Sequence, residues 1–175
     1  HRCLNRSRDC VMALTAGVVF VAIFCSCAFR VSAIVTPIET AVSEVCLGCI
    51  CQAVSKCNAT IGCSDGDCGM FRITKPYWID AGKPTISLDN SEDDGAFSRC
   101  ANDPVCAANT VRQYMSKFTK DCNRDGAINC LDFAAIHTYG GYADDCTIPL
   151  DKDFLEDFQL CINQIQGIDV RGSFD

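Results

Sequence analysis

The sequence predicts a small, disulfide-rich α+β fold that is mainly helical and has a minor β-hairpin lobe. Twelve of the 16 cysteines lie after residue 33, and such a density in a short chain is typical of domains held together by disulfides. Apolar residues recur at helical spacing in several later segments. Between residues 57 and 80 that spacing gives way to short β-prone pieces separated by glycines, which indicates the hairpin lobe.

Residues 1–33 have the composition of a secretory signal peptide. Three arginines precede an apolar run over residues 11–29, and small residues follow it where a signal peptidase would cut. A start at Met12 would give a leader of 22 residues. The alternative is a retained membrane anchor, since about 20 apolar residues span a bilayer, but polar residues interrupt the far end of the run. We therefore expect residues 34–175 to form one secreted, extracellular domain that does not enter a membrane.

The first helix of this domain is predicted to begin after Ser43 and to run to about Ser55. Ser43 is a favourable N-cap, because its hydroxyl oxygen can accept a hydrogen bond from a free backbone N–H of the first turn. Apolar residues then share one stripe at helical spacing. They are Val45, Cys49 and Ala53.

The hairpin lobe follows this helix. Its β-prone pieces are residues 71–74 and 77–79, and glycines punctuate the segment before them. Residues 81–95 are rich in turn formers and end in a run of acidic side chains. Such a composition indicates a solvated surface loop.

Three further helices are predicted. The first starts at Asp103-Pro104, an N-cap followed by proline at the first helical position, and extends to Phe118. The second covers residues 131–138 before two glycines, and the third runs from about residue 152 to Gly167. The buried stripe of the first is Val105, Ala108, Val111, Met115 and Phe118, and that of the third is Phe154, Leu155, Phe158, Cys161, Ile162 and Ile165.

The twelve cysteines of the domain are expected to form six disulfides. Zinc binding is the alternative, but zinc sites usually recruit histidine and His137 is the only one after residue 33. The spacing does not determine which cysteines pair. The cysteines are Cys46, Cys49, Cys51, Cys57, Cys63, Cys68, Cys100, Cys106, Cys122, Cys130, Cys146 and Cys161.

The charge of the domain excludes some partners. The full chain has a net charge of −7, and without the leader 11 basic and 21 acidic side chains leave −10. Such a field repels polyanions, so we expect no binding to nucleic acid and no unspecific adhesion to anionic cell surfaces. Binding to a cell wall would need a shaped site, and we expect the domain to be a monomer.

Several motifs accompany the cysteine spacing. They are Cys46-Leu47-Gly48-Cys49-Ile50-Cys51 with Cys57, Cys68-Gly69-Met70-Phe71-Arg72-Ile73, Tyr77-Trp78-Ile79-Asp80-Ala81-Gly82, Cys100-Ala101 with Cys106-Ala107, Tyr114-Met115, and Phe133-Ala134-Ala135-Ile136-His137 followed by Gly140-Gly141. Together with the cysteine spacing, these motifs resemble the invertebrate-type lysozymes, a family that includes the leech destabilases. The resemblance covers about residues 45–161 and implies a lysozyme-like fold of two lobes with a glycan cleft between them. It also implies hydrolysis of bacterial peptidoglycan, in defence or digestion, with no cofactor required.

One position departs from the family. Glycoside hydrolysis needs a protonated carboxylic acid beside the leaving oxygen and a second carboxylate near the cationic sugar carbon. The resemblance places the acid three residues after the Cys-x-Cys pair, where this chain has Val54. Val54 cannot donate a proton, and general acid–base assistance contributes about 10²–10⁴ in rate. The sequence therefore predicts weak or absent muramidase activity.

The second carboxylate of the family lies between the next two cysteines, in a segment that is shorter here. Asp65 or Asp67 could match it, and an Asx-type turn around Gly66 explains the same residues without chemistry. His137 matches the histidine of the family, whose destabilase members are thought to cleave isopeptide bonds with a serine. The shortening removes that serine, so a structural role for His137 also fits.

Two other motifs suggest binding or modification. Residues 121–132 follow the calcium-loop template, with ligand oxygens expected from Asp121, Asn123, Asp125, Ala127, Asn129 and Asp132. A structural Ca²⁺ and a disulfide-restrained turn fit this segment equally. Asn58-Ala59-Thr60 is an acceptor sequence for N-glycosylation.

Three hypotheses for the function follow. The first is a secreted lysozyme that cleaves peptidoglycan. The second, which the chemistry at Val54 favours, is a non-hydrolytic relative that binds peptidoglycan or a related glycan. The third is a destabilase-like isopeptidase that works through His137.

Overall fold

A computed structural model of the chain describes residues 42–144 and 146–171. The chain divides into two units, 1–37 and 38–175, and everything described lies in the second. The predicted signal peptide therefore lies outside the described residues. Among the residues that are described, no helix is both long enough and apolar enough to cross a membrane.

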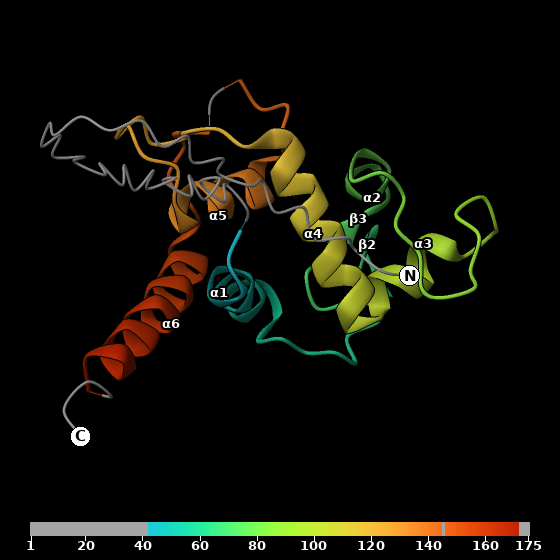
Figure 1. The fold of residues 1–175 in the computed structure, drawn as a ribbon, viewed down its shortest axis with the longest axis horizontal. Helices are drawn as coiled ribbons and strands as arrows, with labels where there is room; N and C mark the ends of the chain where they lie inside the picture. Colours follow the sequence, from blue (N-terminus) through green and yellow to red (C-terminus); the bar gives the residue numbers. More distant parts are fainter. Residues whose placement is uncertain (1–41, 145, 172–175) are drawn as a thin grey trace, which may run out of the picture. The chain divides into compact units, whose positions relative to one another are not determined.

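The described residues form an α+β fold that is mainly helical, as the sequence predicts (Figure 1). A small antiparallel sheet of three two-residue strands, in the order β1-β2-β3, lies between the first and second helices in the chain. The elements are α1 (Glu44–Ser55), β1 (Cys63–Ser64), β2 (Asp67–Cys68), β3 (Ile73–Thr74), α2 (Lys75–Asp80), α3 (Ala96–Asn102), α4 (Pro104–Phe118), α5 (Cys130–Tyr139) and α6 (Lys152–Arg171).

Helix α1 begins where the sequence predicts, because the Ser43 hydroxyl accepts a hydrogen bond from the N–H of Cys46 at 3.2 Å. Its buried residues are Cys46, Leu47, Cys49, Ile50 and Cys51. Val45 was expected on the buried stripe but is 44% exposed, so the stripe is rotated by about one residue. Helix α6 packs along α1 (Figure 1).

All twelve cysteines predicted as disulfide-bonded are paired in the structure. Two bridges join α1 to the last two helices, through Cys46–Cys130 on α5 and Cys49–Cys161 on α6. These close the longest loops, and in the chain-entropy model each contributes about 4–5 kcal/mol to stability. The other pairs are Cys51–Cys57, Cys63–Cys68, Cys100–Cys106 and Cys122–Cys146.

The β lobe differs from the prediction in one element. Residues 77–79 were expected to be β-prone but lie in helix α2. The Thr74 side chain accepts a hydrogen bond from the N–H of Tyr77, and Pro76 stands in the first turn, so the segment carries a helix start that outweighs its aromatic and branched residues. β1 and β2 pair through Cys63–Cys68 and Ser64–Asp67, and β3 adds to β2 through Thr74 and Ile73.

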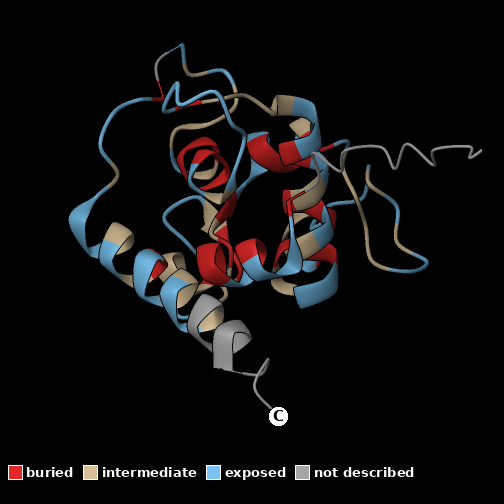
Figure 2. Ribbon diagram, turned by 60° about the vertical axis from the view of Figure 1, so that its left-hand side comes forward, coloured by how far each residue is buried: buried red, intermediate tan, exposed pale blue. Residues whose placement is uncertain are grey.

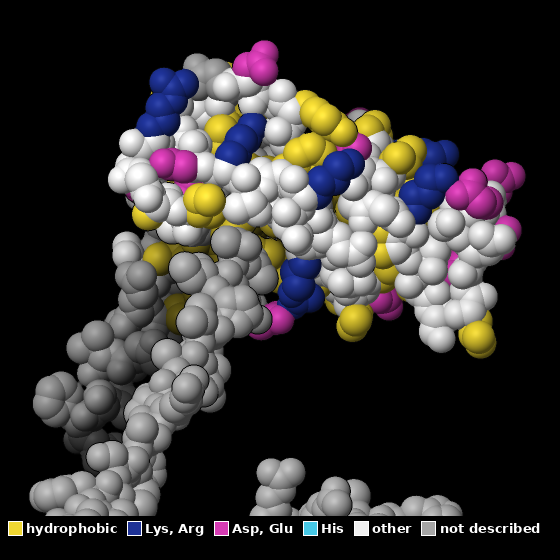
Figure 3. Space-filling view, turned by 45° about the horizontal axis from the view of Figure 1, so that its top comes forward, with side chains coloured by type: hydrophobic (Ala, Val, Ile, Leu, Met, Phe, Trp, Pro, Cys, Tyr) yellow, Lys and Arg dark blue, Asp and Glu magenta, His cyan; other side chains and the backbone are white. Residues whose placement is uncertain are grey.

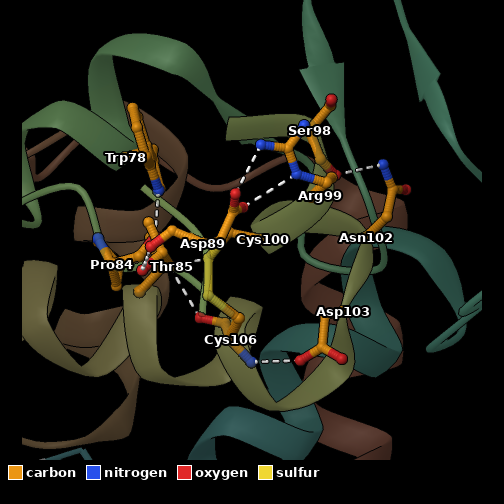
Figure 4. Close-up of a disulfide and its surroundings, with 11 residues drawn as sticks. Trp78, Pro84, Thr85, Asp89, Ser98, Arg99, Cys100, Asn102, Asp103 and Cys106 are labelled. Atoms are coloured by element: carbon orange, nitrogen blue, oxygen red, sulfur yellow. Dashed lines mark hydrogen bonds and ion pairs between the residues drawn. A yellow bond between two sulfur atoms is a disulfide. The ribbon is translucent and has the colours of Figure 1, made fainter. Parts of the chain in front are cut away.

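The acidic loop between α2 and α3 is held in place by one side chain from each of these two helices (Figure 4). The indole N–H of Trp78 donates to the Pro84 carbonyl at 2.7 Å. Asp89 receives two hydrogen bonds from the Arg99 guanidinium, at 2.9 and 2.7 Å, beside the Cys100–Cys106 disulfide. This bidentate pair fixes the loop more firmly than a single ion pair would, because both partners are held in one plane.

Helices α4 and α5 supply much of the core, and Figure 2 shows their buried faces turned inward. α4 begins at Asp103-Pro104 as predicted, and the Asp103 side chain accepts from the N–H of Cys106 at 2.8 Å. Val111 and Met115 are fully buried, whereas Val105 is 79% exposed. The prediction for Val105 was wrong because Ala107, Thr110 and Tyr114 occupy the inward face beside them.

Helix α6 begins at Lys152, as the sequence predicts, and Phe158 is its buried contact with the core. The helix extends to Arg171 instead of ending at Gly167. An interior glycine costs only about 1 kcal/mol relative to alanine, which is too little to end a helix by itself.

Candidate functional site

Val54, where the resemblance to the invertebrate-type lysozymes places the acid, lies in the last turn of α1. Val54 is half-buried there, and Lys56 ends the helix in the left-handed conformation, donating its N–H to the carbonyls of Cys51 and Gln52. Ser55, the next residue, donates its hydroxyl to the Met70 carbonyl at 2.6 Å. This bond joins the end of α1 to the turn between β2 and β3, so Val54 stands where the helical part of the chain meets the β lobe.

The two candidates for the second carboxylate lie on the β1–β2 hairpin. Asp65 and Gly66 form its two-residue turn, both with positive φ, which is the geometry of a type I′ turn. Asp65 is exposed. Asp67, on β2, forms an ion pair with the Arg72 Nε at 2.8 Å and is only 19% exposed. The turn interpretation explains Asp65 and Gly66, while Asp67 is paired with one specific side chain, that of Arg72.

Arg72 is the residue that holds Asp67, and its backbone has φ 51°. A bulky residue in the left-handed region is uncommon and costs on the order of 1 kcal/mol. In the sequence, Arg72 is visible only as part of a motif, because nothing in its spacing links it to Asp67. Their contact depends on the register that pairs Asp67 with Thr74 across the sheet.

His137, on α5, has both ring nitrogens occupied. Nε2 lies 2.9 Å from the Phe71 carbonyl, so this nitrogen carries the proton, and Nδ1 accepts from the Tyr77 hydroxyl at 3.2 Å. Burial lowers the pKa of His137 to about 4, although the bond to the Phe71 carbonyl opposes this shift. The imidazole is therefore neutral at pH 7 and has no free lone pair.

His137 and Ser55, the residue after Val54, form hydrogen bonds to adjacent backbone carbonyls. Ser55 bonds the Met70 carbonyl and His137 bonds that of Phe71, so the end of α1, the start of the β2–β3 turn and α5 converge at one place. The sequence suggested His137 from a motif but gave no sign of its partner Tyr77, which lies 60 residues away.

The segment proposed as a calcium loop uses most of its side-chain oxygens internally. Asp132 is fully buried and accepts backbone N–H groups from Cys122, Asn123 and Asn129. Together with the Asn129 side chain it forms a capping box at the start of α5. In the described part of the chain, no three or more His, Cys, Asp or Glu side chains are grouped so as to hold a metal ion.

The remaining members of that template also accept hydrogen bonds within the loop. Asp121 accepts from the N–H of Gly126 at 2.9 Å, and Asp125 accepts from the N–H of Ala127 at 2.8 Å and from Asn123. Ala127, which would offer its carbonyl, is exposed. One oxygen of Asp121 is buried and has no hydrogen-bond partner among residues 42–144 and 146–171.

The acceptor sequence for N-glycosylation lies in an exposed turn just after α1. The Asn58 side-chain oxygen accepts from both the N–H and the hydroxyl of Thr60, at 3.0 and 2.8 Å. The three residues of the sequence are exposed, so the amide nitrogen is accessible.

Charged side chains are dispersed over the surface. On the face shown in Figure 3, lysine and arginine side chains stand apart from one another, with hydrophobic and uncharged surface between them. Ion pairs such as Lys83–Glu92 and Lys117–Asp80 neutralise some of them locally.

The fold and the cysteine framework define a small α+β domain whose helices are joined to each other by disulfides. Comparison with protein families gives a match to the Destabilase family over residues 43–161. A lysozyme of Magallana gigas is 39% identical over 106 residues, which cover 58% of this chain and 69% of that protein. A lysozyme of Ostrea edulis is 38% identical over 119 residues, covering 65% of this chain and 77% of that protein.

The crystal structure of Tapes japonica lysozyme is similar at 30% identity, with a TM-score of 0.48, covering 68% of this chain and 87% of that one. The family match covers more than half of this chain, and the Magallana gigas alignment covers 69% of that lysozyme at 39% identity, which together establish the family. This chain belongs to the Destabilase family, whose matched relatives are named lysozymes, including the invertebrate-type lysozymes.

Proposed function

We propose that this protein is a secreted member of the family that binds bacterial peptidoglycan or a related glycan and hydrolyses it weakly or not at all. The observation that carries the proposal is Val54. The side chain that stands in the last turn of α1, beside the β lobe, has no proton to donate to a leaving oxygen. A defensive or digestive role in extracellular fluid is consistent with a domain held by six disulfides.

Replacement of the acid by another residue of α1 is unfavourable. Glu44 is the only carboxylate on this helix, ten residues before Val54, so it lies about 15 Å away along the axis. Glu44 forms an ion pair with Arg112 on α4. Its carboxylate is therefore already engaged by a side chain of another helix.

Asp67 supports the part of the proposal that concerns the glycan. A carboxylate paired with Arg72 is suited to stabilise positive charge on a sugar, not to act as the acid. Asp65, exposed at the tip of the hairpin, is the other candidate for this role. With either aspartate in this role, the proposed site would keep one of the two groups that the reaction needs.

The decisive experiment compares the parent with Val54→Glu in one muramidase assay, with Val54→Gln as the matched control. Glutamine has the size of glutamate but no acidic proton. We expect a gain of about 10² or more for Val54→Glu and no gain for Val54→Gln, because a positioned acid contributes about 10²–10⁴. Robust turnover by the purified parent would overturn the proposal.

Binding is measured separately. We expect the parent to sediment with purified peptidoglycan without releasing reducing ends. A parent that neither sediments with peptidoglycan nor gains activity as Val54→Glu has no working glycan site, and both halves of the proposal would then fail.

The isopeptidase alternative is less favoured by the contacts of His137. A general base needs a free lone pair, and Nδ1 already accepts from the Tyr77 hydroxyl. Ser55 bonds the carbonyl next to the one that His137 bonds, but its hydroxyl donates to Met70 and not to His137. We expect a γ-glutamyl-lysine substrate to remain uncleaved, and cleavage that disappears in His137→Gln would restore this alternative.

Calcium binding by residues 121–132 remains a prediction. Asp132, which would be the last ligand of the loop, would have to exchange hydrogen bonds to three backbone N–H groups for the ion. This exchange favours the interpretation as a turn that is held by the capping box and by the disulfides of Cys122 and Cys130.

A further inference from the structure

Tyr142 is an exposed aromatic residue whose surroundings are unusually well ordered for a surface loop. Its side chain is 70% exposed, yet its hydroxyl donates to Asp80 Oδ1 at 3.0 Å. Its ring packs against Phe118 in a T-shaped arrangement, with the ring centres 4.8 Å apart at an interplanar angle of 68°. One ring that is fixed at two points therefore presents its surface to solvent.

The backbone on both sides of Tyr142 is fixed as well. The N–H of Gly141 donates to the Tyr114 hydroxyl at 2.7 Å. The Lys120 ammonium donates to the carbonyls of Gly141 and Ala143, at 3.1 and 2.6 Å. A Cβ on Gly141 would lie 2.0 Å from Phe118 Cγ, so only glycine allows the loop to approach α4 this closely. The exposed ring is thus held by its scaffold before any ligand arrives.

Polar groups from two other elements stand beside the ring. Lys117, on α4, donates to the backbone carbonyl and to Oδ1 of Asp80, each at 3.1 Å. Hydrogen bonding to Asp80 raises the pKa of Lys117 above its usual value, so it stays charged at neutral pH. The contacts among described residues use Asp80 Oδ1 but not Oδ2, which leaves one acceptor at the end of α2 beside one partly exposed ammonium group.

We propose that Tyr142, Asp80 and Lys117 form a binding surface for a sugar ring of an N-acetylhexosamine glycan. An aromatic face packs against the apolar C–H side of a pyranose, while the carboxylate accepts from a hydroxyl and the ammonium donates to a hydroxyl or an acetamide carbonyl. A rigid ring with adjacent donors and acceptors binds without a large cost in ordering. The inference rests on the proposed function in that the ligand is the same glycan.

This surface is connected to the candidate site by packed rings. Tyr77, which bonds His137, stacks on Tyr114 with centres 3.5 Å apart, and Tyr114 packs on Phe118 at 4.5 Å. Phe118 in turn supports Tyr142. Tyr77 and Tyr114 are buried, so these rings support Tyr142 from within the core and tie it to the element that carries His137.

The test measures binding of a soluble N-acetylglucosamine hexamer and of insoluble peptidoglycan to the parent, Tyr142→Ala and Tyr142→Phe. Leu88→Ala is the control, because Leu88 is a fully exposed apolar side chain on the acidic loop and is not part of the proposed surface. Thermal unfolding of each variant verifies that the fold is intact. We expect Tyr142→Ala to weaken binding about tenfold, which is about 1.4 kcal/mol, and Tyr142→Phe to weaken it less. Leu88→Ala should bind like the parent.

Each outcome decides the matter. If the parent binds glycan and Tyr142→Ala binds within about twofold of it at unchanged stability, the inference is wrong while the proposed function stands. If the parent hydrolyses glycan robustly and Tyr142→Ala still binds tenfold more weakly, the proposed function is wrong and the inference stands. A parent that binds neither probe overturns both.

Discussion

Two disulfide-bounded turns of this protein carry aspartates, and they use them differently. In the 121–132 segment, Asp132 is fully buried and both of its carboxylate oxygens accept hydrogen bonds from backbone N–H groups. In the β1–β2 hairpin, Asp67 is paired to one side chain, Arg72, and Asp65 is exposed. A carboxylate saturated by backbone amides is part of the scaffold, whereas one held by a side chain or by water remains open to a ligand. Sequence templates do not distinguish these two states.

The largest effect on stability should come from the saturated carboxylate. Asp132→Asn replaces one acceptor oxygen by an NH₂ group that faces a backbone N–H, so we expect a loss of about 2–4 kcal/mol in the free energy of unfolding. Asp125→Asn, in the same loop but exposed, is the control and should cost less than about 1 kcal/mol. Urea unfolding with intact disulfides measures both.

Calcium sharpens the same experiment. If the loop binds the ion, calcium at ten times its Kd would stabilise the parent by about 1.4 kcal/mol relative to chelator. We expect the parent and Asp132→Asn to differ by the same amount in calcium and in chelator. A calcium-dependent difference would restore the ion-binding interpretation of the loop.

The next effect concerns His137, a half-buried residue whose two ring nitrogens both have hydrogen-bond partners. Its pKa is about 4 in the folded state and 6.5 as a free side chain, so below pH 6.5 the unfolded chain binds a proton that the folded chain does not. Stability should fall as the pH drops from 6.5 to 4, by about 2–3 kcal/mol from this residue. His137→Gln, compared with the parent at pH 7 and pH 4.5, should lose less stability on acidification. An equal loss in both proteins would mean that His137 is not desolvated.

The smallest effect on stability, and the sharpest test of the comparison, should come from Asp67. Asp67→Asn removes one partly exposed ion pair, so we expect a cost of less than about 1 kcal/mol. In the Val54→Glu background the same change should abolish the gained muramidase activity if Asp67 is the second carboxylate. Asp65→Asn in that background is the alternative assignment, and the variant that keeps its activity identifies the residue that is not used.

The sequence predicts elements best where capping chemistry is local. Ser43 and Asp103 mark the starts of α1 and α4, and both accept the backbone N–H that their position requires. Helix α3 went unpredicted because it begins after Gly95, which has no side chain to cap it. The prediction for residues 77–79 was wrong because the helix start at Thr74 and Pro76 outweighs their β propensity.

The residues of the candidate site also differ in whether local sequence spacing predicts them. The register of the first cysteines is enough to place Val54, since the spacing is local. The environments of Asp67 and His137 are not predictable from spacing, because Arg72 and Tyr77 reach them through tertiary pairing. Tyr142 carries no sequence signal at all, since its meaning comes from Asp80 and Lys117, which lie on two other helices.

The bridges from α1 to α5 and α6 have a consequence for biosynthesis. Cys46 and Cys49 leave the ribosome among the first cysteines of the domain, but their partners follow 84 and 112 residues later. At about 5–20 residues per second, both thiols wait several seconds while nearer cysteines emerge. The chain must therefore keep its earliest thiols from premature bonding until α6 has been made, and loss of Cys161 would leave Cys49 without its natural partner in every molecule synthesised.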